Sequence, residues 1–121
     1  MMSRILVVED NPENLELMRY LLRAFGHVTL SANNGEDGVA IALRERPEII
    51  VCDIDMPELD GYGVVHALQS DPTLCRTPFI AVTALAMVGD RETVLAAGFD
   101  GYIGKPIDPT TFVREVERFL G

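Results

Sequence analysis

Hydrophobic residues in this chain follow two patterns that alternate five times. Short continuous apolar runs, such as Ile49–Cys52, are typical of strands buried on both faces of a parallel sheet. The longer stretches between them place apolar residues at helical spacing. We expect strands at 4–9, 27–31, 49–53, 79–83 and 101–104, and helices at 12–25, 35–46, 62–69, 88–97 and 109–120. The alternation predicts an α/β fold, a doubly wound five-stranded parallel sheet with right-handed crossovers and helices on both faces.

The first and last predicted helices carry the clearest local signals. Asn11 suits the N-cap of the first helix, and Pro12 suits its first helical position. Gly26 suits the left-handed residue that ends a helix. The residues expected to face the sheet are Leu15, Met18, Leu22 and Phe25 in the first helix and Phe112, Val116 and Phe119 in the last.

Length and composition limit the classes of protein to consider. We expect one domain over residues 1–121, with no attached output domain. The net charge of −9 argues against direct nucleic-acid binding, which depends on Lys and Arg neutralising phosphates. No segment approaches the roughly 20 apolar residues that span a bilayer, so no membrane insertion is expected. Cys52 and Cys75 lack metal-ligand or redox spacing, and a cytoplasmic location is the expectation.

Four predicted strands end in residues that can carry chemistry. The first runs into Glu9 and Asp10, the third ends at Asp53, the fourth ends at Thr83, and the fifth leads into Lys105. Taken singly, each has a structural explanation, such as turn formation, the positive end of the next helix, a strand position or a solvated lysine. The carboxyl ends of parallel strands meet at one edge of a sheet, where ligands bind in such folds. The occurrence of these acidic, hydroxyl and ammonium groups at successive strand ends therefore favours a shared crevice.

Three carboxylates in one crevice favour a bound cation. Two carboxylates about 4 Å apart repel by roughly 4 kcal/mol at an effective dielectric constant near 20. Mg²⁺ prefers oxygen ligands and keeps several waters and a substrate phosphate, so it suits the cluster. Asp10, Asp53 and the backbone carbonyl of Asp55 can supply ligands, and Glu9 can bind through water or tune the charge.

The same cluster suits phosphoryl transfer, which is mostly a matter of positioning and charge stabilisation. Lys105 is a point charge for a phosphate oxygen, and Thr83 offers a hydroxyl donor. Asp53 would then be the nucleophile and form an aspartyl phosphate.

Over its whole length the chain resembles the receiver domain of a two-component response regulator. The motifs that carry the resemblance are Val8-Glu-Asp-Asn11, Asp53-Ile-Asp-Met-Pro-Glu-Leu-Asp-Gly61, Val82-Thr-Ala84 and Gly98-Phe-Asp-Gly-Tyr-Ile-Gly-Lys-Pro106. The resemblance implies the flavodoxin-like strand order 2-1-3-4-5. It also implies a stoichiometric phospho-acceptor, with slow self-phosphorylation and dephosphorylation, in place of an enzyme.

The resemblance assigns a role to each site residue. Asp53 would accept a phosphoryl group from a partner's histidine, and Mg²⁺ would be held by Glu9, Asp10, Asp53 and the Asp55 carbonyl. Thr83 and Lys105 would bind the phosphoryl oxygens, and the Lys105–Pro106 peptide bond would be cis. Tyr102 matches the family's switch aromatic, which would turn inward when Thr83 moves toward the phosphoryl group. Alternatively, Tyr102 is a half-buried tyrosine at the sheet edge with a structural role alone.

Partners follow from the same resemblance. The phosphoryl donor would be a sensor or hybrid histidine kinase or a histidine phosphotransfer protein. A downstream protein would bind the surface formed by 88–97, 101–104 and 109–120, and the chain would be a monomer or weak dimer. Gly89 lowers helix propensity, so we expect the helix at 88–97 and the loop before it to be mobile. Asp55 and Leu85 would line the entry to the phosphoryl group.

Two other functions are compatible with parts of the sequence. Asp53-Ile-Asp55 is an Asp-x-Asp motif like that of haloacid-dehalogenase-type phosphatases, which would turn over phosphate esters. The other is a flavodoxin-like binder of flavin or nucleotide, and a flavin binder would purify with its chromophore. Against this function, residues 10–14 are acidic where a phosphate-binding loop needs Gly and hydroxyl groups. His27 and His66 lie at no strand's carboxyl end and are expected to be solvated or partly buried structural residues.

Overall fold

The computed structural model describes residues 3–84 and 88–120 and shows five strands alternating with five helices. The strands are β1 (Arg4–Val8), β2 (Val28–Ala32), β3 (Ile49–Asp53), β4 (Phe79–Thr83) and β5 (Gly101–Gly104). The helices are α1 (Pro12–Ala24), α2 (Gly35–Glu45), α3 (Gly61–Gln69), α4 (Val88–Ala96) and α5 (Phe112–Glu117). All strand pairs are parallel and the order is β2-β1-β3-β4-β5, so the predicted fold class and strand order are confirmed.

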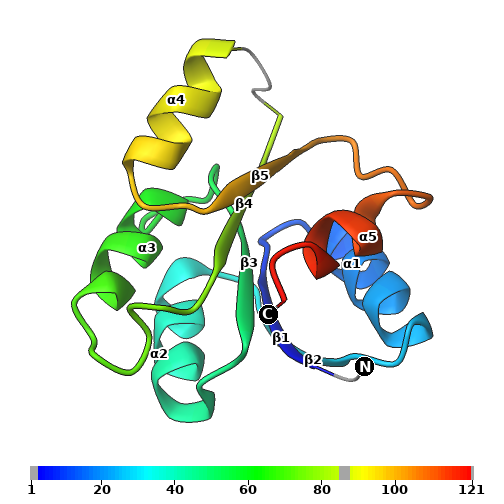
Figure 1. The fold of residues 1–121 in the computed structure, drawn as a ribbon, viewed down its shortest axis with the longest axis horizontal. Helices are drawn as coiled ribbons and strands as arrows, with labels where there is room; N and C mark the ends of the chain where they lie inside the picture. Colours follow the sequence, from blue (N-terminus) through cyan, green and yellow to red (C-terminus); the bar gives the residue numbers. More distant parts are fainter. Residues whose placement is uncertain (1–2, 85–87, 121) are drawn as a thin grey trace.

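The sheet is the middle of three layers, with α1 and α5 on one face and α2, α3 and α4 on the other (Figure 1). Alternate residues of β1 serve different faces: Ile5 and Val7 pack with α1 and α5, whereas Leu6 and Val8 pack with the other helices. All four side chains have no exposed surface. Two-sided burial explains why the strands have continuous apolar sequences.

All five helices differ from their predicted ranges by at least one residue, and the differences in α1 and α5 have a structural consequence. α1 ends at Ala24, so Phe25 is the C-cap and is 63% exposed instead of facing the sheet. α5 begins at Phe112, not Pro109, because the Asp108 side chain accepts the backbone N–H and hydroxyl of Thr110. This local turn competes with helical bonding over 109–111. α5 also ends early, at Glu117.

Other predictions fall outside the described residues. Leu85 and the loop at 85–87 are not described, so the expected mobility of that loop and the place of Leu85 at the site entry stay predictions. Among the described helices, none has the length and apolar character that crossing a bilayer demands.

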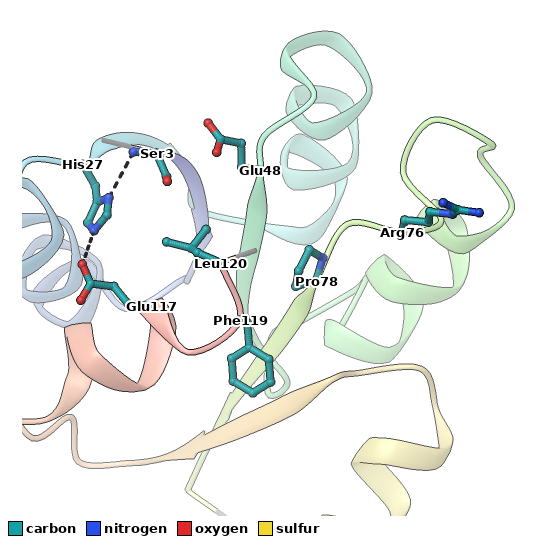
Figure 2. Close-up of a pocket in the computed structure, with 8 residues that line it drawn as sticks. All are labelled: Ser3, His27, Glu48, Arg76, Pro78, Glu117, Phe119 and Leu120. Carbon is teal, nitrogen blue, oxygen red and sulfur yellow. Dashed lines mark hydrogen bonds and ion pairs between the residues drawn. The ribbon is translucent and has the colours of Figure 1, made fainter. Parts of the chain in front are cut away.

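A cavity of about 640 Å³ lies at the amino-terminal edge of the sheet (Figure 2). Its wall includes Ser3, Glu48 and Pro78, which directly precede or adjoin the starts of three strands, so it is at the opposite edge from the predicted site. His27 lines it and is buried, more than was expected. Its Nδ1 accepts the Ser3 N–H at 3.2 Å, and its Nε2 lies 2.8 Å from Glu117 Oε2. This histidine ties the start of β1 to the end of α5.

Candidate functional site

The carboxyl ends of β1, β3, β4 and β5 bring the predicted site residues to one edge of the sheet. Glu9 follows β1 and has no exposed surface; Asp53 and Thr83, the last residues of β3 and β4, are each 1% exposed. Asp10 is exposed at the rim. Asp53 pairs with Val82 in the parallel ladder, so the carboxylate lies beside the end of β4. Burying two carboxylates costs free energy unless a charge or metal compensates them.

Lys105 supplies part of that compensation. Its Nζ lies 3.1 Å from Glu9 Oε1 and 3.2 Å from Asp53 Oδ2, and its side chain is 19% exposed. Burial lowers the pKa of Lys105, but the carboxylates of Glu9 and Asp53 outweigh burial, and the pKa is raised. The ammonium group is therefore held charged between the two carboxylates. Lys105 is the only lysine in a chain with nine arginines. Its ammonium group is a compact point charge, unlike the planar fork of an arginine.

Backbone hydrogen bonds hold the carboxylates in place. The Asn11 N–H donates to Glu9 Oε2 at 3.1 Å, and the Asp55 N–H donates to Asp53 Oδ1 at 3.1 Å. Each carboxylate therefore has one oxygen bound to its own following loop and the other oxygen facing Lys105. The Asp55 side chain is exposed, and the direction of its carbonyl stays a prediction.

Gly61 brings the loop after β3 back against the strand. Its N–H donates to the Ile54 carbonyl at 3.0 Å. A Cβ at position 61 would lie 2.7 Å from the Asp53 carbonyl oxygen and 2.8 Å from Ile54 Cα, closer than real contacts allow. The sequence indicated a turn at Asp60-Gly61, but not that the glycine packs against the backbone of Asp53.

Lys105 is the first residue of the loop after β5. The Lys105 N–H donates to the Thr83 carbonyl at 2.8 Å, which continues the β4–β5 ladder by one residue. The Lys105–Pro106 peptide bond is cis. The hydrogen bond fixes where the lysine leaves the sheet, directly beside the end of β4.

Glu9, Asp10 and Asp53 form an acidic group that fits a divalent cation. One carboxylate oxygen from each lies within 4.8 Å of the others. Burial raises the pKa of Glu9 to about 7, and the neighbouring Asp53 carboxylate adds to the effect. Glu9 Oε1 is buried and lies 3.1 Å from Lys105 Nζ, and it has no hydrogen-bond partner among the described residues. Three carboxylates and one ammonium leave two formal negative charges, and all the side-chain donors are oxygen, which suits Mg²⁺.

Tyr102 lies on the same face of the sheet as Thr83. In the β4–β5 ladder Tyr102 pairs with Ala81, and Thr83 is two residues further along β4, so both side chains point to the face covered by α4. Tyr102 is half-buried against this core. The guanidinium carbon of Arg91, on α4, lies 5.9 Å from the centre of the Tyr102 ring. No pattern in the sequence indicates this contact, because it depends on how α4 packs beside β5.

A family model described as the response regulator receiver domain matches residues 5–117 of this chain. The chain belongs to the response regulator receiver family. Polar-differentiation response regulator DivK of Brucella anthropi is 39% identical over 121 residues, covering 100% of this chain and 98% of that protein. The sequence-based recognition is confirmed.

Solved structures agree with this assignment. Chemotaxis response regulator CheY4 of Vibrio cholerae has a TM-score of 0.94 at 25% identity, over 99% of this chain and 100% of that one. The receiver domain of sensor histidine kinase PA1611 from Pseudomonas aeruginosa is 36% identical with a TM-score of 0.90, over 100% and 99% of the two chains. That domain has a magnesium ion coordinated in its active-site cleft.

Family membership decides between the functions that the sequence left open. Receiver domains belong to two-component signalling and act as switches that interact with histidine kinases or phosphotransfer proteins, not as classical enzymes. The family is neither that of the haloacid-dehalogenase-type phosphatases nor that of flavin-binding flavodoxins.

Proposed function

We propose that this receiver domain accepts a phosphoryl group on Asp53 from a phosphohistidine of a sensor or hybrid histidine kinase, or of a histidine phosphotransfer protein. A carboxylate oxygen of Asp53 forms the new P–O bond as the donor's P–N bond breaks, and the imidazole nitrogen keeps the electron pair of that bond. The product is an aspartyl phosphate, an established form of covalent intermediate.

One contact supports this function most directly: Lys105 Nζ lies within 3.2 Å of a carboxylate oxygen of both buried acids, Glu9 and Asp53. An ammonium group at this place can stay close to Asp53 and bind an incoming phosphoryl oxygen. Thr83 is buried at the end of the next strand and supplies a hydroxyl group at the same edge of the sheet. Lys105 and Thr83 therefore orient the phosphoryl group and stabilise its charge.

Mg²⁺ is the proposed cofactor, held by Glu9, Asp10, Asp53 and the backbone carbonyl of Asp55. When bound, it supplies positive charge to the phosphoryl oxygens and to the acidic group. Glu9 and Asp53 contribute their buried carboxylates, and Asp10 contributes an exposed one at the rim. Hydrogen bonds from the Asn11 and Asp55 amides keep the first two carboxylates oriented toward the shared space.

The proposed output is a change in the surface formed by α4, β5 and α5. Thr83 moves toward the phosphoryl group, and Tyr102 turns inward on the same face of the sheet. A downstream protein then binds the altered surface. The ladder register supports this coupling, since only one residue of β4 separates Ala81, the partner of Tyr102, from Thr83.

The test is intact-mass measurement after incubation with acetyl phosphate, a small phosphodonor, in Mg²⁺ and in EDTA. We expect one alkali-labile phosphoryl group that requires Mg²⁺ and is absent from Asp53→Asn. Asp55→Asn is the matched control, because it removes an exposed carboxylate two residues away and should still be phosphorylated. Phosphorylation of Asp53→Asn, or none of the wild type with either acetyl phosphate or a phosphorylated histidine phosphotransfer domain, contradicts the proposal.

A further inference from the structure

Arg91 and Tyr102 make a contact that joins α4 to β5. The guanidinium carbon lies 5.9 Å from the ring centre, within the range of a cation–π interaction. α4 is anchored nearby by Val94, which is 2% exposed and belongs to the core on this face of the sheet. Arg91 itself is exposed, so its guanidinium group approaches the ring from the solvent side.

The ring of Tyr102 therefore has two different neighbours. On the inner side it packs against the apolar core that includes Ala81 and Val94; on the outer side it meets Arg91. Among the side chains of residues 3–84 and 91–120, no carboxylate forms an ion pair with Arg91. Within this part of the chain, the aromatic ring is thus the partner of the Arg91 charge.

A hollow of about 270 Å³ lies beside this contact. Arg91, Tyr102, Glu115 and Arg118 are among the residues that line it. Arg118 is exposed like Arg91 and lines the same hollow, but it has no contact with the Tyr102 ring among the described interactions. The two arginines therefore contribute equal charge to one surface and differ in the ring contact.

We propose that Arg91 is a positioning residue for Tyr102 and sets the equilibrium between the two orientations of its ring. It stabilises the orientation that Tyr102 has in this structure, and the contact must break when the ring turns inward toward Thr83. The inference rests on the proposed function and adds to it a residue on α4 that controls how readily the switch moves. A cation–π contact at an exposed site corresponds to a roughly two- to fivefold change in the ratio of the two ring orientations.

The test compares Arg91→Gln with Arg118→Gln. Both remove one positive charge from the same surface, and only the first removes the ring contact. The chain has three tyrosines, so ¹³C labelling of tyrosine rings gives a simple NMR spectrum in which Tyr102 is assigned with Tyr102→Phe. In the unphosphorylated, Mg²⁺-containing protein, we expect the Tyr102 signal of Arg91→Gln to shift toward its position in the phosphorylated wild type, and that of Arg118→Gln to stay unchanged.

A double-mutant cycle gives a second readout that a merely structural role would not move. Arg91→Gln should increase the rate of phosphorylation by acetyl phosphate about two- to fivefold in the wild-type background, and should have no effect in Tyr102→Leu. Equal ring shifts in the two glutamine variants, or the same rate effect in Tyr102→Leu, overturn the inference.

Failure of the proposed function can be told apart from failure of this inference. If no variant accepts a phosphoryl group, the proposed function is wrong. The unphosphorylated NMR spectra still decide whether Arg91 holds the ring, because a Tyr102 signal that is unchanged in Arg91→Gln overturns the inference by itself.

Discussion

Replacing Lys105 by Met tests how the acidic site is balanced. The substitution keeps a side chain of similar length but removes the ammonium group 3.1 Å from Glu9 and 3.2 Å from Asp53. Each contact corresponds to roughly 5 kcal/mol of attraction at an effective dielectric constant near 20, most of which is offset by desolvation. Removing one partner of a buried ion pair costs about 3–5 kcal/mol. Lys105 is partly exposed, so we expect about 3 kcal/mol when both carboxylates are charged.

The cost should depend on pH through Glu9. Its pKa is raised from 4.5 to about 7, chiefly by burial, so between these values the folded state binds more protons than the unfolded state. Glu9 therefore makes the wild type less stable as pH rises through this window. Without Lys105 the pKa of Glu9 rises further, so the stability of the variant continues to fall up to a higher pH. The difference between Lys105→Met and wild type should be smaller near pH 5.5, where Glu9 is protonated, and approach its full size near pH 8.5.

Urea unfolding followed by circular dichroism at these two pH values, with and without Mg²⁺, measures the effect. Mg²⁺ should reduce the difference at pH 8.5, because it supplies charge to the same carboxylates. Arg44→Met is the control: its surface ion pair with Glu45 is exposed and should contribute less than about 1 kcal/mol at either pH. A difference between Lys105→Met and wild type that does not change with pH, or does not change with Mg²⁺, would refute the reasoning.

Three further predictions concern other parts of the fold. Gly61→Ala should destabilise the protein by about 1–3 kcal/mol in urea unfolding and slow phosphorylation, because its Cβ would lie 2.7 Å from a β3 carbonyl oxygen. Gly26→Ala is the control, since the space there is open but φ is +91°. It should lower stability and leave the phosphorylation rate unchanged. His27→Ala should cost about 1–3 kcal/mol in thermal unfolding through its buried hydrogen bonds and leave Mg²⁺ binding intact, whereas His66→Ala on the exposed side of α3 should have little effect. In titration calorimetry, Mg²⁺ affinity should fall as pH drops below about 7, because Glu9 takes up a proton. Glu9→Gln should weaken Mg²⁺ binding and make the affinity less dependent on pH. An unchanged pH profile in that variant would show that another group titrates.

Local patterns were sufficient for the elements and their order. Continuous apolar runs such as Ile49–Cys52 predict strands covered on both faces. Asn11 and Pro12 predict the start of α1, where the Asn11 side chain accepts two backbone N–H groups. The helix ends were less predictable. Phe25 continues the apolar spacing of α1 but lies at its C-cap, since the helix ends one residue earlier than the apolar pattern does. Periodicity records which residues can face a core, not where hydrogen bonding stops.

The sequence by itself determined the fold class, the strand order through family resemblance, and the set of acidic, hydroxyl and ammonium groups at successive strand ends. Parallel strands bring their carboxyl ends to one edge, so these groups had to be neighbours. Only the tertiary structure decided that Lys105 contacts both Glu9 and Asp53, that Gly61 packs against the Asp53 backbone, and that Arg91 covers Tyr102. The Lys105 contacts join segments far apart in the chain, and all three depend on how helices and loops pack on the sheet, which no local pattern of residues encodes.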